Sequence, residues 1–69
     1  MTISPKLLDL IKDITDDGDI LSDKKLLRIV LNSIKMDYEH DIKMEKDSGE
    51  DVEYLMPIYN EVLRLLNAL

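Results

Sequence analysis

The residues from Ser22 to Lys46 read SDKKLLRIVLNSIKMDYEHDIKMEK and contain the longest periodic pattern in the chain. Apolar side chains recur in it at spacings of three and four residues, which places them on one face of an α-helix. They are Leu27, Val30, Leu31, Ile34, Tyr38 and Ile42. The sequence therefore predicts a long amphipathic helix over Ser22–Lys46 whose apolar face builds a core.

The sequence has a clear signal for the start of this helix and a weaker one for its end. Ser22 is predicted to cap the start, because its hydroxyl can accept a hydrogen bond from a free N–H group of the first turn. Toward the other end the like-charged residues Asp37 and Asp41 lie one turn apart, a spacing that destabilises a helix. We therefore expect the helix to fray after His40.

A shorter helix is predicted before the long one. Ser4 and Pro5 form a favourable helix start, with a capping hydroxyl followed by a proline whose missing N–H costs nothing in the first turn. The apolar face expected to follow consists of Leu7, Leu10, Ile11 and Ile14. We predict a helix over Pro5–Asp16, ended by Gly18 in the left-handed conformation. The short loop Asp17–Leu21 then predicts that the two helices are antiparallel neighbours.

The last part of the chain is apolar and periodic but contains a proline. After a polar turn at Ser48-Gly49, apolar residues recur at Val52, Leu55, Tyr59, Val62, Leu66 and Leu69. Pro57 predicts either one kinked helix or a short helix over Glu50–Leu55 followed by a helix over Pro57–Ala68, and we favour the second. Residues 1–69 are thus predicted to form a single all-α domain, a compact antiparallel bundle of three to four helices.

The composition narrows the class of protein. A chain of 69 residues is near the lower limit for one hydrophobic core. It contains no cysteine and one histidine, His40, so we expect no disulfide, no zinc site, no other metal and no cofactor. The beginning MTISPKLL lacks the pattern of a signal peptide, and no apolar run approaches the roughly 18 residues of a membrane span. We predict a cytoplasmic protein without a membrane partner.

The negative charge is concentrated between Asp37 and Glu53, a segment that we call the acidic window. Nine basic and fifteen acidic residues give a net charge of −6, which disfavours direct binding of nucleic acid, because phosphates must be neutralised by lysine and arginine. Two lysines, Lys43 and Lys46, lie among the acids of this window. The acids are Asp37, Glu39, Asp41, Glu45, Asp47, Glu50, Asp51 and Glu53. The window is either a solvated face that keeps the protein soluble or a docking surface for a basic protein partner.

Two short stretches partly match the sequence patterns of known binding or attachment sites. Asp13–Lys24 alternates oxygen-bearing residues around Gly18 as a calcium loop does, but Lys24 occupies the twelfth position, where an EF-hand has a glutamate. Asp47-Ser48 resembles the attachment site of acyl carrier proteins, although Gly49 stands where that family has leucine. No nucleophile and base pair and no Gly-rich phosphate loop is evident, so we expect no enzymatic activity.

A tyrosine within the acidic window is the remaining signal. Tyr54 lies off the apolar stripe and next to several carboxylates, a composition typical of an interface anchor, although it also suits a residue that covers the edge of a core. We predict a partner-binding surface with no catalytic residues. Its residues are Asp37, Glu39, Asp41, Glu50, Asp51, Glu53 and Tyr54.

Four motifs together match a known family. They are Leu8-Asp9-Leu10-Ile11, Ser22-Asp23 with Leu26, Ile29 and Val30, Ser48-Gly49-Glu50-Asp51-Val52-Glu53-Tyr54 with Pro57, and Ile58-Tyr59-Asn60-Glu61-Val62. With these motifs the chain resembles the immunity proteins of colicin and pyocin nucleases. That resemblance implies a small acidic four-helix protein with a short third helix that neutralises a nuclease. It also implies that Asp51 and Tyr54 contact the toxin, while the exposed face of the long helix sets specificity.

Two functions of different classes follow from these patterns. The first is a small acidic protein-binding module, an inhibitor or immunity-type protein that occupies the basic surface of a nuclease or another nucleic-acid-binding protein. The alternative is a structural or regulatory helical module that forms a homodimer through the exposed part of its apolar faces.

Overall fold

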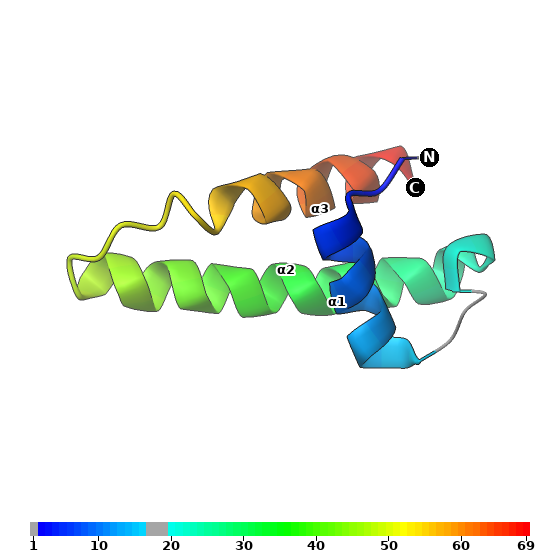
Figure 1. The fold of residues 1–69 in the computed structure, drawn as a ribbon, viewed down its shortest axis with the longest axis horizontal. Helices are drawn as coiled ribbons and strands as arrows, with labels where there is room; N and C mark the ends of the chain where they lie inside the picture. Colours follow the sequence, from blue (N-terminus) through cyan, green and yellow to red (C-terminus); the bar gives the residue numbers. More distant parts are fainter. Residues whose placement is uncertain (1, 17–19) are drawn as a thin grey trace.

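The computed structural model describes residues 2–16 and 20–69, and these form three α-helices and one short 3₁₀ helix, with no strand among them. In chain order the elements are α1 (Pro5–Thr15), η1 (Ile20–Ser22), α2 (Lys24–Asp47) and α3 (Met56–Ala68). Figure 1 shows α3 returning along α2 in the opposite direction, while α1 crosses α2. The predicted all-α class is confirmed.

Each helix contributes one face to a single core. The buried side chains of this core are Leu7, Ile11, Ile20, Leu27, Val30, Leu31, Ile34, Ile58, Val62 and Leu65. The predicted face of α2 is confirmed at Leu27, Val30, Leu31 and Ile34, which are buried. The last two residues of that face, Tyr38 and Ile42, are only partly buried. The burial decreases along α2, so the core is densest where α1 crosses it and thins toward Asp47.

The start of α1 is tied to α3. Ser4 caps α1 as predicted, its Oγ accepting a hydrogen bond from Leu7 N at 3.4 Å. The carboxylate of Glu61 on α3 accepts from Ser4 N at 2.9 Å and from Ser4 Oγ at 2.5 Å. These contacts hold the start of α1 against the middle of α3.

The end of α1 differs from the prediction by one residue. The helix ends at Thr15, and the left-handed residue that follows is Asp16, with a φ of 54° and its N–H donated to Lys12 O. The predicted role of Gly18 lies outside the described residues. The predicted antiparallel pairing of this helix with α2 is wrong, because α1 crosses α2 (Figure 1). The connection between the two helices in the sequence contains η1, which buries Ile20.

Both ends of α2 correct the sequence prediction. The capping residue is Asp23, whose Oδ1 accepts from Leu26 N at 3.2 Å, because Ser22 belongs to η1. The helix does not fray after His40 but continues to Asp47. Two donors from the chain that follows bond to Glu45 in this part of the helix: the Tyr54 hydroxyl to its carboxylate, and Glu50 N to its carbonyl at 2.8 Å. These bonds oppose the fraying expected from like-charge repulsion. Gly49 then closes the segment with a φ of 79°.

The antiparallel pairing of α2 with α3 is marked by a contact at each end. Near the start of α3, the Tyr59 hydroxyl donates to Glu39 Oε2 at 2.8 Å. Near its end, Arg28 Nη2 donates to the Leu69 carbonyl at 2.6 Å. The early part of α3 therefore lies beside the late part of α2, as Figure 1 also shows.

Pro57 separates a turn from a helix. It occupies the first turn of α3, so the predicted break is confirmed, but the short helix predicted over Glu50–Leu55 does not form. That segment is extended and then turns, with Leu55 N donating to Val52 O at 3.0 Å. The buried face of α3 is rotated from the predicted stripe, because its buried residues are Ile58, Val62 and Leu65. The predicted Tyr59, Leu66 and Leu69 are only partly buried.

Candidate protein-binding surface

Tyr54 lies in the turn between α2 and α3, with 61% of its surface exposed. Its hydroxyl donates a hydrogen bond to Glu45 Oε1 on α2. The ring is therefore presented to solvent in a held orientation, which lowers the entropy lost when a partner covers it. This is the arrangement expected of an interface anchor.

Carboxylates from two segments gather around this tyrosine. The hydrogen bond to Glu45 is the main cause that raises the pKa of Tyr54 to about 12, with smaller contributions from burial and from the negative charges of Glu45, Asp41 and Glu50. Each of these groups disfavours the tyrosinate anion. The structure thus brings two predicted residues, Asp41 and Glu50, to Tyr54 and adds Glu45, which the sequence prediction missed.

The place of Glu45 beside Asp41 could have been predicted from its spacing in the sequence. It lies four residues after Asp41, so both carboxylates fall on one side of α2. Its role depends on the segment that crosses this end of the helix, however, since one oxygen accepts from Tyr54 and the other is buried without a hydrogen-bond partner among the described residues. The sequence alone does not place Tyr54 beside it.

Asp51 and Glu53 are exposed in the same turn as Tyr54. The Asp51 Oδ1 atom accepts a hydrogen bond from Glu53 N at 3.0 Å, which stabilises the turn locally. These two residues therefore extend the carboxylates around Tyr54 along the loop. We refer to the combined set as the Tyr54 surface, made up of Asp41, Glu45, Glu50, Asp51, Glu53 and Tyr54.

Two predicted residues do not contact Tyr54. Glu39 accepts the hydrogen bond of Tyr59 and forms an ion pair with Lys35 at 3.5 Å, so it faces α3. The same hydrogen bond, followed by burial and the charge of Glu39, raises the pKa of Tyr59. Asp37 is exposed one turn before Asp41. The predicted set is therefore divided between two sides of α2.

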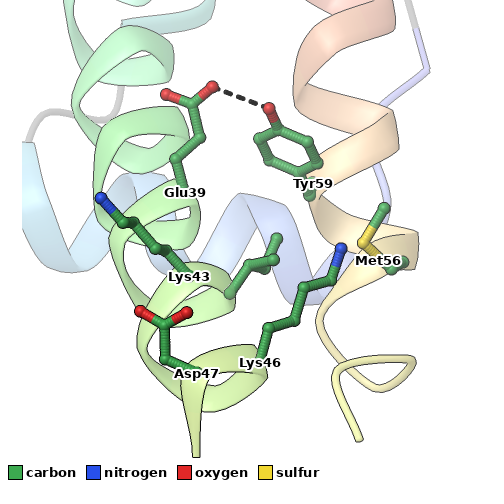
Figure 2. A pocket seen from close by; sticks show the side chains of 7 residues that line it. Glu39, Lys43, Lys46, Asp47, Met56 and Tyr59 are labelled. Atoms are coloured by element: carbon green, nitrogen blue, oxygen red, sulfur yellow. Dashed lines mark hydrogen bonds between the residues drawn. The ribbon is translucent and has the colours of Figure 1, made fainter.

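A cleft of about 410 Å³ lies between the second half of α2 and the start of α3. Figure 2 shows the hydrogen bond between Glu39 and Tyr59 at one end of this cleft. Its lining residues are Glu39, Ile42, Lys43, Lys46, Asp47, Met56 and Tyr59. The sequence prediction missed the cleft, because it assigned Ile42 and Tyr59 to the core and did not place Met56 beside them.

Within residues 2–16 and 20–69, no cluster of three or more His, Cys, Asp and Glu side chains is arranged to hold a metal ion. None of the helices in this part of the chain is long and apolar enough to cross a membrane. The chain matches no family model, no curated protein and no solved structure.

Proposed function

We propose that this protein is an inhibitor or immunity-type protein that binds the basic surface of a nuclease or another nucleic-acid-binding protein. The observation that carries the proposal is the exposed ring of Tyr54, held by Glu45 and surrounded by carboxylates. An aromatic anchor within a polar rim is the usual composition of a binding hot spot.

The charge of the Tyr54 surface suits such a partner. Proteins that bind nucleic acid present lysine and arginine to phosphates, so a group of carboxylates can occupy the same surface. The concentrated negative charge also accelerates association with a positively charged partner, an effect that salt weakens. Competition with nucleic acid follows directly, because the two ligands require the same basic side chains.

The proposal can be tested in two stages. Immobilised protein is first used to capture basic proteins from a cell lysate at low salt, and each captured protein is purified. The purified protein is then assayed for nuclease activity or nucleic-acid binding while this chain is added. Stoichiometric inhibition that weakens with salt is the expected result.

Variants then assign the inhibition to the Tyr54 surface. Tyr54→Ala and Asp51→Lys are expected to abolish inhibition while the helical circular dichroism is retained. Asp13→Lys reverses the same charge at an exposed position of α1 and is the matched control, expected to inhibit nearly as well. Equal inhibition by Tyr54→Ala and Asp51→Lys refutes the site, and the lack of inhibition by the unaltered protein refutes the function.

A homodimeric helical module is a second candidate function, favoured by apolar side chains on the outer side of α2. Ile29 and Met36 are 62% and 67% exposed and lie seven residues apart, which places them on one face of the helix. A second copy could cover this face. Light scattering at low and high protein and salt concentrations distinguishes the candidates, because a dimer that persists in high salt favours self-association and a monomer throughout refutes it.

A further inference from the structure

The cleft between α2 and α3 has an apolar floor. Ile42 of α2 and Met56 and Tyr59 of α3 line it, and each of these side chains is partly buried. The Tyr59 hydroxyl is already engaged by Glu39, which holds the ring in place as one wall. The volume of about 410 Å³ is within the range of small-molecule sites, which is about 300–1,000 Å³.

A lysine extends over this floor without an ion pair. Figure 2 shows the side chain of Lys46 reaching from α2 toward Met56, whereas that of Lys43 points away from α3. The ion pairs among the described residues are Lys35 with Glu39 and Arg64 with Glu61, so Lys46 takes part in neither. An apolar floor below an available ammonium group is complementary to a ligand with an apolar body and a negative head.

The acidic residues of the cleft restrict the charge of such a ligand. The carboxylate of Glu39 is occupied by Tyr59 and Lys35, so it repels an anion weakly. Asp47 lines the opposite end of the cleft and carries a charge that no ion pair within the described part of the chain neutralises. A ligand with one negative charge can pair with Lys46, whereas a second negative charge would be placed closer to Asp47.

We propose that this cleft binds a medium-chain alkyl carboxylate, with the alkyl chain against Ile42 and Met56 and the carboxylate beside Lys46. The site is separate from the Tyr54 surface and does not depend on the protein-binding function proposed above. Burial of the alkyl chain supplies the affinity, because apolar area removed from water contributes most, and the ammonium group selects the sign of the head group.

Methionine methyl resonances report on this binding directly. The protein is labelled at its methionine methyl groups and titrated with decanoate, at concentrations where decanoate is monomeric. The Met56 resonance is expected to shift, while those of Met36 and Met44, which are 67% and 56% exposed on α2, are expected to stay unchanged. An unchanged Met56 resonance, or equal shifts at Met36 and Met44, overturns the proposal.

Ligand variants test the two chemical requirements. Butyrate has too short a chain to cover the floor, so it is expected to leave the Met56 resonance unchanged. Decyltrimethylammonium has the same alkyl chain length as decanoate but the wrong charge, so it is expected to bind more weakly and to shift Met56 less than decanoate at equal concentration. Vesicles that contain an anionic phospholipid are expected to leave the Met56 resonance unchanged, because the proposed ligand is a free molecule. A shift by decyltrimethylammonium equal to that by decanoate, or a shift by vesicles alone, overturns the proposal.

A matched pair of protein variants tests the assigned lysine. Lys46→Gln is expected to raise the dissociation constant of decanoate about two- to fivefold, the effect of one exposed ion pair. Lys25→Gln removes the same charge from the first turn of α2, far along the helix from the cleft, and is expected to leave the dissociation constant unchanged. Equal dissociation constants for the two variants contradict the role of Lys46.

Discussion

Two truncations on α2 are predicted to have very different effects on stability. Leu31 is fully buried in the core, with 0% of its surface exposed, whereas Met36 lies on the outer side of the same helix with 67% exposed. Replacing a buried leucine by alanine costs about 2–5 kcal/mol, because apolar contacts are lost and a cavity remains. Replacing an exposed side chain changes the free energy of unfolding by about 0.5 kcal/mol or less.

These costs are large relative to the total for so small a chain. At about 0.05–0.15 kcal/mol per residue, 69 residues have a free energy of unfolding of about 3–10 kcal/mol. Leu31→Ala therefore removes about a fifth or more of it, and at about 4–8 °C per kcal/mol it lowers the melting temperature by about 8 °C or more. Met36→Ala is expected to shift the melting temperature by only a few degrees, about 4 °C at most.

Urea and thermal unfolding followed by far-ultraviolet circular dichroism measure both variants. The reasoning is refuted if Leu31→Ala unfolds at the midpoint of the unaltered protein, because Leu31 would then not belong to the core. A large loss in Met36→Ala that depends on protein concentration would show that a second copy covers the outer side of α2. That result would favour the homodimeric module over the inhibitor.

Three further predictions concern the tyrosine, the cap and the turn. Because the pKa of Tyr54 is raised from 10.0 to about 12, its contribution to stability is complete below pH 10 and is lost as the pH rises from 10 to about 12. Tyrosinate absorbance should show a late step that Tyr54→Phe removes, and titration of every tyrosine near 10 contradicts this. Ser4→Ala should lower the free energy of unfolding in urea by about 1–2 kcal/mol, because the capping bond to Leu7 N and the bond from the Ser4 hydroxyl to Glu61 are lost while that from Ser4 N remains. An unchanged urea midpoint argues against both side-chain bonds. Gly49→Ala should lower the free energy of unfolding by about 1 kcal/mol through backbone strain alone, because φ is 79° and no atom lies within 4 Å of an added Cβ. Gly49→Asn should lower it less, and equal losses for the two variants would show that strain is not the cause.

Part of the candidate site was evident before the structure. The acidic window and Tyr54 were predicted as a partner surface because charge and residue type can be read directly from the chain. Their grouping was not evident. Glu45 bonds to Tyr54 only because the turn after Gly49 brings the tyrosine back beside α2. Glu39 bonds to Tyr59 of α3 instead. The cleft was missed for the same reason, since its floor combines Ile42 with Met56 from a different helix.

The all-α class, the buried first half of α2 and the break at Pro57 could be predicted from the order of the amino acids, because each depends on local periodicity or on the chemistry of one residue. Tertiary structure alone decided where α2 ends, how α1 crosses it and which side of α3 is buried. Tyr54, in the turn that follows, donates to Glu45 near the end of α2, and Tyr59 of α3 donates to Glu39 six residues earlier. Local patterns do not contain such contacts, because their partners meet only when the helices have packed.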